Sequence, residues 1–452
     1  MGYSSQGRKP IERASKISHA EVINSPAVKE FVARCMMPTR SSGSELGPLL
    51  LRLDDDVDTS DVRAVIAIDG GFTEAPVRDE FPFASIAFYT FGPLLLEMAD
   101  LRDVEQKRFI APEDIAKLKR LERYNFVLPL RGIRLSDARS LSETVRRSIY
   151  EFFCERKGPE QETLIETLAW FLFRKWDPSR EPQRQELEWC PNEDCAQQKI
   201  QFDRDSPHEI SCLGCGRSVY LTDVFRLHER VDEEQGSAAI AAYVMGVLEQ
   251  MVLVHLIKSV LEIKPSLLGQ ILFIKDGPLA FFGLVAPLCR PMRELTTYLL
   301  TRSADGASSR LRVVGLEKSG AFVEHARAIQ ESVPPGSFLI CSNEYIYRYI
   351  VPGDSLTAIY GSNTYYGQKV IFRARTGEMH VATIPSVEYS AAPSQQDIPF
   401  LAETLTLVGA LRCSMYENAL VPIALVNKLV SLSDFPSQRI LTTFARNALR
   451  EK

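Results

Sequence analysis

The chain of 452 residues is long enough for two or three domains, or for one large domain with insertions. A hydrophobic content of 45% and a charged content of 25% are typical of a soluble globular protein and exclude a disordered chain. The net charge of -5 excludes a strongly basic chain but leaves room for a local basic groove. Because the polar N-terminus has no apolar signal segment, we expect a cytoplasmic protein whose nine cysteines favour metal binding over disulfides.

The N-terminal part predicts helical structure followed by a first core strand. Residues 19–35 have helical character, with Pro26 either interrupting the helix or starting a new turn. A short strand is expected near residue 50, before an acidic turn. The sequence AVIAIDGG, residues 64–71, is a continuous apolar run, so it predicts a buried strand that ends at Asp69 and turns at the two glycines.

Aromatic and helical patterns follow the first core strand. Residues 81–91 alternate and are rich in aromatic side chains, which predicts a strand returning along the first one. Residues 94–101 either extend that strand or form another. Helices are then expected from Ala111, over residues 136–153 and over residues 161–176.

Four cysteines form the most specific local motif. Cys190 and Cys195 are followed, after a short polar spacer, by Cys212 and Cys215. Two short cysteine pairs at this spacing are typical of a zinc ribbon, in which four thiolates hold a structural Zn²⁺ in tetrahedral geometry. The alternative is a coincidental set of cysteines with no metal.

A long apolar segment precedes the second core strand. Residues 238–257 have the length of a membrane span, but Glu249, Gln250 and His255 favour a buried helix of a soluble core. Glu249 is the exception among its apolar neighbours. Either it lies on a narrow exposed stripe, or it needs a cation or a buried hydrogen-bond partner.

A second strand repeats the pattern of the first. Residues 271–274 are apolar, and the strand is predicted to end at Asp276 before a turn at Gly277 and Pro278. Two core strands that each end in a carboxylate predict a site for hard cations, which activate water and bind phosphate oxygens. The alternative is that each aspartate caps a turn or a following helix.

The remainder of the chain predicts a mixture of helices and strands. The strand over residues 311–320 ends in Lys318, which either meets a phosphate or is merely solvated. The other expected elements are a helix at 290–300, an antiparallel continuation of the sheet at 338–390, and helices at 400–413, 420–432 and 437–452.

Five motifs in this order resemble those of the NurA nucleases. They are AIDGG, VLEQ, LFIKDGPL, VVGLEK and a C-terminal helix entered through a proline segment. The resemblance implies an α/β, RNase H-like (PIWI-related) fold with a mixed sheet flanked by helices. It also implies Mn²⁺- or Mg²⁺-dependent DNA cleavage, a homodimer and a HerA-like hexameric ATPase as partner.

The resemblance also assigns residues and segments. Asp69, Glu249 and Asp276 match the acidic residues, and Gly315 to Lys318 match the GxxK strand end. Asn427 stands where the family has a histidine ligand, and Tyr416 or His380 are alternatives for that role. The implied segments are 1–104 and 236–452 as the two parts of the nuclease core, 105–185 as a helical insertion and 186–235 as an inserted zinc ribbon.

The resulting hypothesis is a metal-dependent deoxyribonuclease in DNA end processing or anti-phage defence, with no membrane association. Asp69, Glu249 and Asp276 would hold the cation, and Lys318 would bind a phosphate oxygen. The zinc ribbon would dock DNA or the ATPase. The alternatives are a catalytically weak assembly factor that binds DNA and the ATPase, and an unrelated zinc-ribbon protein of RNA metabolism.

Overall fold

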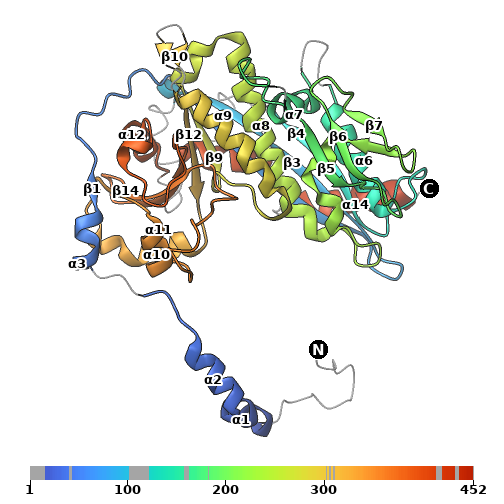
Figure 1. Cartoon of the computed structure of the whole chain (residues 1–452), viewed down its shortest axis with the longest axis horizontal. Coiled ribbons are helices and arrows are strands. Elements are labelled where there is room, and N and C mark those ends of the chain that lie inside the picture. Colours follow the sequence, from blue (N-terminus) through green and yellow to red (C-terminus); the bar gives the residue numbers. More distant parts are fainter. Residues whose placement is uncertain are drawn as a thin grey trace.

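The computed structural model describes residues 16–39, 43–100, 122–156, 162–181, 183–301, 303–304, 307–308, 311–413, 420–432 and 437–450. A nine-stranded sheet forms the centre of the molecule, in the order β1-β13-β14-β15-β12-β9-β2-β3-β4 (Figure 1). The strands are β1 (Leu51–Arg52), β2 (Ala64–Arg78), β3 (Ala84–Glu97), β4 (Tyr124–Arg131), β9 (Ile271–Asp276), β12 (Arg312–Glu317), β13 (Ser337–Ile340), β14 (Gln368–Arg373) and β15 (Met379–Ile384).

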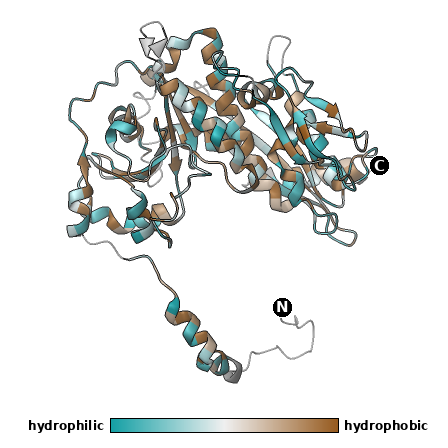
Figure 2. Cartoon of the chain, in the orientation of Figure 1, coloured by the Kyte–Doolittle hydropathy of each residue, from teal (hydrophilic) through white to brown (hydrophobic). Residues whose placement is uncertain are grey.

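Three strands at the middle of this sheet are parallel and their neighbours are antiparallel. β9 pairs in parallel with β2 on one side and with β12 on the other. β3 and β15 flank this parallel trio, and both run antiparallel to it. In Figure 2, β9 and β12 are largely hydrophobic, which is typical of parallel strands covered on both faces. The carboxyl ends of β2, β9 and β12 therefore meet at one edge of the sheet.

Helices cover both faces of the sheet. One face packs against α6 (Leu141–Cys154), α7 (Leu164–Leu172), α8 (Ala241–Ile263) and α9 (Cys289–Thr301), and farther along against α10 (Ala321–Ile329) and α11 (Asn343–Tyr349). The opposite face packs against α12 (Leu401–Ala410) and α13 (Val421–Val430). Along β2 the side chains alternate, so that Ile66 and Ile68 join the α8 core while Val65 and Ala67 join the α13 core.

The long helix α8 is buried in the fold, as predicted. The segment Ala238–Ile263 is the one described helix that is long and apolar enough to cross a membrane, and 72% of its most apolar window is buried. The helix packs against α7 and against strands β2, β3 and β9. Glu249 and Gln250 are buried with it, so the exposed-stripe alternative for Glu249 is wrong.

The first core strand is longer than predicted. β2 continues through Asp69 and both glycines to Arg78, and it pairs with β3 in a long hairpin. Gly70 and Gly71 do not turn the chain. A Cβ atom on Gly70 would lie 2.4 Å from the Met245 methyl group of α8 and 2.8 Å from the Phe91 Cβ atom, so glycine allows close packing of helix and strand.

Three other local predictions differ from the structure. β4 lies in the segment predicted to be helical and adds an edge strand beside β3. α6 begins after the N-cap Ser140 and α7 after Thr163, which forms a capping box with Glu166; each begins later than predicted. The predicted helix from Ala111 begins within residues 101–121, which lie outside the described residues.

The helix α11 lies where a strand was expected. The aromatic and aliphatic residues of 343–349 are enriched in strands, which explains the wrong prediction. Ser342, however, caps a helix by accepting a hydrogen bond from the Tyr345 N–H at 3.2 Å. The burial of Tyr345, Ile346 and Tyr349 then follows helical spacing.

At the N-terminus, α1 (Lys16–Asn24) and α2 (Pro26–Arg34) confirm the predicted helical segment, with Pro26 starting the second helix. This pair extends away from the body of the molecule (Figure 1). No described side chain of α2 is buried. The short strand predicted near residue 50 is β1, at one edge of the sheet.

The close contact between α8 and β2 predicts the effect of enlarging Gly70. We expect Gly70→Ala to lower the free energy of unfolding by about 1–3 kcal/mol, because the Phe91 Cβ atom cannot move without shifting β3. Gly246→Ala is the control, since a Cβ there meets nothing within 4 Å. It should raise the free energy by about 0.5–1 kcal/mol through helix propensity. Chemical denaturation measures both; equal stability of the two variants would contradict the packing described.

Candidate active site and zinc-binding cluster

Asp69 and Asp276 lie side by side at the ends of two adjacent parallel strands. Ile68 of β2 is level with Lys275 of β9, so the next residues of the two strands are also level. Neighbouring strands are about 4.8 Å apart. Because side chains alternate along a strand, both aspartates point to the α13 face, as Ala67 and Ile274 do.

Asp69 is a buried carboxyl group with one oxygen unpartnered. It is 3% exposed, and its Oδ1 accepts a hydrogen bond from the Gly70 N–H at 2.8 Å. Its Oδ2 is buried and has no hydrogen-bond partner among the described residues. Burial, followed by the charges of Asp276 and Glu249, raises the pKa of Asp69 to about 8. The carboxyl group therefore holds a proton at neutral pH. A metal cation bound to this carboxyl group could replace that proton.

Lys318 contacts the second aspartate from the neighbouring strand. It directly follows β12, and its ammonium group donates to Asp276 Oδ2 at 2.8 Å. Its side chain is 42% exposed, whereas that of Asp276 is 21% exposed. The lysine thus lies at the solvent side of the strand ends, where it can reach an approaching phosphate.

Glu249 reaches the same sheet edge from the opposite face, and it has a partner that the sequence did not reveal. Its carboxylate forms an ion pair of 2.7 Å with the ammonium group of Lys275. Lys275 also donates to the backbone oxygen of Asp276 at 2.6 Å. Burial raises the pKa of Glu249 although Lys275 opposes this shift. The only signal for Lys275 was a charged residue in the otherwise apolar run ILFIKD.

The three predicted acidic residues are electrostatic neighbours but do not form one closed ligand shell. Asp276 and Glu249 both raise the pKa of Asp69, which places them around it. Within the described residues, however, the four cysteines are the one group of three or more His, Cys, Asp or Glu ligand atoms that lie within 4.8 Å of one another. The paired oxygen donors and the unpartnered Asp69 Oδ2 fit a hard cation such as Mg²⁺ or Mn²⁺.

The residues considered for the family's histidine-ligand position lie elsewhere or outside the described residues. Asn427 is exposed on α13, and within the described part no hydrogen bond joins its side chain to the acidic residues. His380 is buried and stacks on Phe372. Burial lowers the pKa of His380 to about 4, and the charge of Glu378 opposes this shift. Tyr416 is not among the described residues.

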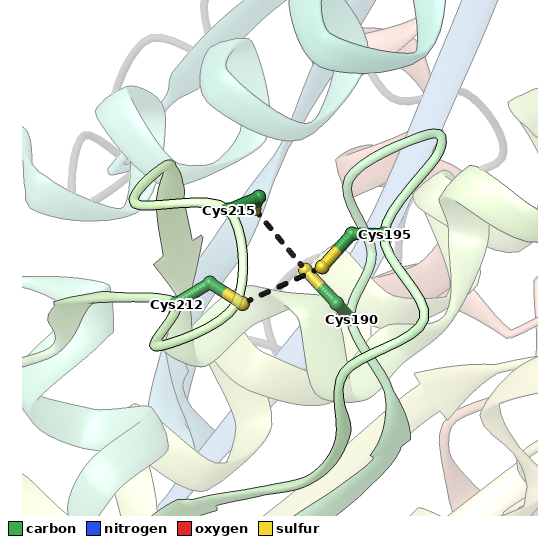
Figure 3. Close-up of side chains that lie close together, drawn as sticks. All are labelled: Cys190, Cys195, Cys212 and Cys215. Atoms are coloured by element: carbon green, nitrogen blue, oxygen red, sulfur yellow. Dashed lines mark hydrogen bonds between the residues drawn. The ribbon is translucent and has the colours of Figure 1, made fainter.

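The four predicted zinc ligands come together from two hairpins (Figure 3). Cys190 and Cys195 lie between β5 (Gln185–Trp189) and β6 (Gln198–Phe202), and Cys212 and Cys215 lie between β7 (Glu209–Ser211) and β8 (Ser218–Tyr220). The sulfur atoms are 4.0 Å apart for Cys190–Cys215 and 3.7 Å apart for Cys195–Cys212. Four thiolates about 2.3 Å from one ion require separations of this size, so the cluster fits a tetrahedral Zn²⁺.

A buried polar chain attaches this ribbon to helix α6. The amide of Asn192 donates to Cys190 Sγ at 3.3 Å and accepts from Arg146 at 2.8 Å. Arg146, on α6, also forms two hydrogen bonds with Asp223, of 2.8 and 2.7 Å. Apolar ribbon residues such as Leu187 and Phe202 belong to the same core as α6, α7 and α8. The ribbon is therefore packed onto the body of the protein.

Comparisons with known proteins give a structural similarity of low score. No protein-family model matches the sequence, and no curated protein matches it. Among solved structures, the chain is similar to the NurA nuclease from Sulfolobus solfataricus, at 9% sequence identity and a TM-score of 0.35. The likeness covers 97% of this chain and 99% of the other. The role of each site residue follows from its own contacts in this chain.

Because Asp69 is buried, replacing it with asparagine is predicted to stabilise the protein, and the size of the effect should depend on pH. Its pKa is about 8 in the folded protein against an ordinary value of 3.8, so the unfolded chain releases a proton that the folded protein keeps. Stability therefore falls as pH rises from about 4 to 8. We expect Asp69→Asn, without added metal, to be more stable than wild type by about 1–3 kcal/mol at pH 8, with the difference shrinking towards pH 4.

Urea denaturation across this pH range measures the effect. Asp79→Asn is the control, because the Asp79 side chain is 60% exposed. A wild-type protein whose stability relative to Asp69→Asn did not change with pH would show that Asp69 is ionised in the fold.

The cysteine cluster predicts one tightly bound zinc per chain. Cys212→Ser should remove the zinc and increase hydrogen exchange in the ribbon and in α6, because Asn192 and Arg146 join the two. Cys35→Ser, at an exposed cysteine, should keep both the metal and the protection. Metal analysis of the purified protein and hydrogen-exchange mass spectrometry provide the readouts. Zinc retained by Cys212→Ser would contradict a four-thiolate site.

Proposed function

We propose that this protein is a divalent-metal-dependent DNA nuclease with an RNase H-like core. The observation that carries the proposal is the pair Asp69 and Asp276, level on adjacent parallel strands, with one buried carboxylate oxygen unpartnered. Two carboxylates in this arrangement need a cation, a proton or both. The motifs that resemble the NurA nucleases contribute these same residues, together with Glu249 and Lys318.

The roles of the residues follow from their positions. Asp69 and Asp276 would hold Mg²⁺ or Mn²⁺, and Glu249 is the third carboxylate of the site. When bound, the ion would activate water and balance the negative charge of the scissile phosphate. Asp69 would release its proton as the cation arrives. Lys318, half-exposed at the strand ends, would leave Asp276 and bind a non-bridging phosphate oxygen.

The surroundings of the site support hydrolysis without a covalent intermediate. The charged groups that shift the pKa values of Asp69 and Glu249 are carboxylates and lysines. Gln250, next to Glu249, bonds to the Ala280 oxygen at 3.1 Å and accepts from the Tyr366 hydroxyl at 2.7 Å. These bonds fix the loop after Asp276 to α8. The chain thus supplies ligands and a rigid frame, and water is the expected nucleophile.

A second candidate is an assembly factor with little or no cleavage activity. The exposed Asn427, at the position where the family has a histidine ligand, favours it. In either case we propose DNA and a HerA-like hexameric ATPase as partners, with the chain acting as a homodimer. The zinc ribbon would dock one of these partners. The biological role would be DNA end processing or defence against foreign DNA.

Removal of one ligand charge tests the proposed chemistry. We expect Asp276→Asn to lower the rate of DNA cleavage by about a hundredfold or more, because the cation loses a charged ligand. DNA binding should be nearly unchanged, since most backbone contacts of a bound duplex are made to phosphates other than the scissile one at this site. The assay is cleavage of linear duplex DNA with Mn²⁺ or with EDTA, and binding is measured in parallel by fluorescence anisotropy.

An exposed aspartate provides the control for this assay, and two outcomes would contradict the proposal. Asp79→Asn should cleave like wild type, because Asp79 is exposed and follows the far end of β2, ten residues beyond Asp69. Undiminished cleavage by Asp276→Asn would eliminate the proposed mechanism. Absence of cleavage by wild type, with a HerA-like ATPase present, would favour the assembly factor.

A further inference from the structure

Lys275 places an enclosed positive charge inside the acidic site, where it forms an ion pair with Glu249. The Lys275 side chain is 7% exposed and the Glu249 side chain 11% exposed, and their charged atoms are 2.7 Å apart. The ammonium group also donates to the Asp276 backbone oxygen at 2.6 Å. These two contacts hold the ammonium group between helix α8 and the carboxyl end of β9.

The sheet separates this pair from the two aspartates. Phe273 packs in the α8 core, and Lys275, two residues later on β9, points to the same face. Asp276 points to the other face, where Asp69 lies beside it. The site therefore has two compartments at one sheet edge, with two aspartates on the α13 side and the Lys275–Glu249 pair on the α8 side.

The charges of the two compartments are balanced differently. Glu249 has Lys275 as a buried partner, and removing such a partner leaves an uncompensated buried charge. Asp276 has Lys318, whose side chain is 42% exposed and can move into solvent. Asp69 has an oxygen with no hydrogen-bond partner in the described structure. In the α13 compartment, Lys318 can therefore move into solvent and leave its place to a metal ion at a small cost in free energy. In the α8 compartment, Lys275 cannot leave Glu249 in this way.

We propose that Lys275 is a fixed internal cation that occupies the position a second divalent ion would otherwise take. The site then binds a single divalent cation, held by Asp69 and Asp276. Glu249 acts through Lys275 and is not a direct ligand. This inference rests on the metal site of the proposed function and narrows it. A second divalent ion would have to bind beside Glu249 on the α8 side, where the ammonium group of Lys275 already neutralises that carboxylate and would repel the ion.

The test counts Mn²⁺ ions bound to the full-length, zinc-loaded protein without DNA. Electron paramagnetic resonance of free Mn²⁺ and isothermal titration calorimetry give the stoichiometry. Wild type should bind one Mn²⁺ per chain. Lys275→Met, which replaces the aliphatic stem but lacks the charged terminal nitrogen, should bind two and should show the line broadening of two coupled Mn²⁺ ions. Lys318→Met is the matched control and should still bind one, with higher affinity.

The single variant Lys275→Met leaves the buried Glu249 without a partner and can misfold. The double variant Lys275→Met/Glu249→Gln removes both buried charges and therefore avoids this problem. It should return to one Mn²⁺ per chain. Two ions in wild type, or one in a folded Lys275→Met, would overturn the role of Lys275 and leave the nuclease proposal standing. No Mn²⁺ binding by wild type would overturn both. One bound ion without DNA cleavage would overturn only the nuclease.

Discussion

Negative charge placed inside an apolar fold is the constraint on which this structure depends. Asp69, Asp276 and Glu249 gather at the carboxyl ends of buried strands, where an isolated carboxylate is costly. The negative charge of each carboxyl group is neutralised in a different way. Asp69 keeps a proton, Asp276 pairs with a lysine at the surface, and Glu249 pairs with a lysine in the interior. Carboxyl groups arranged in this way have the chemistry of cation ligands.

The rest of the fold holds these charges in place. The three parallel strands set the level of the acidic residues, and antiparallel neighbours extend the sheet on both sides. Gly70 lets α8 approach β2 closely enough for Glu249 to reach the strand ends. Gln250 fixes the loop after Asp276 through Ala280 and Tyr366. The precision of the site thus comes from backbone packing around it.

The four-cysteine cluster, which fits a zinc ion, is joined to the same scaffold through charged groups as well as apolar packing. Arg146 is a buried guanidinium group that bonds to Asp223 and to Asn192, and Asn192 bonds to a zinc-ligand sulfur. Bidentate pairing with Asp223 satisfies a cation that would be costly to bury alone. Loss of the metal is therefore expected to reach α6, which packs in the core shared with α8. The ribbon and the part of the molecule that holds the acidic residues therefore share one core.

Local sequence determined the elements whose signals lie within a few residues. The apolar runs that end at Asp69, Asp276 and Glu317, and the spacing of the four cysteines, were sufficient to predict strands, candidate acids and a metal cluster. Tertiary structure decided what depends on neighbours distant in the chain. It made Asp69 and Asp276 level, paired Lys275 with Glu249, and carried β2 through two glycines that resemble a turn. Such pairings depend on which strands lie adjacent and which helix crosses them. A turn signal or a single lysine in the sequence does not indicate either.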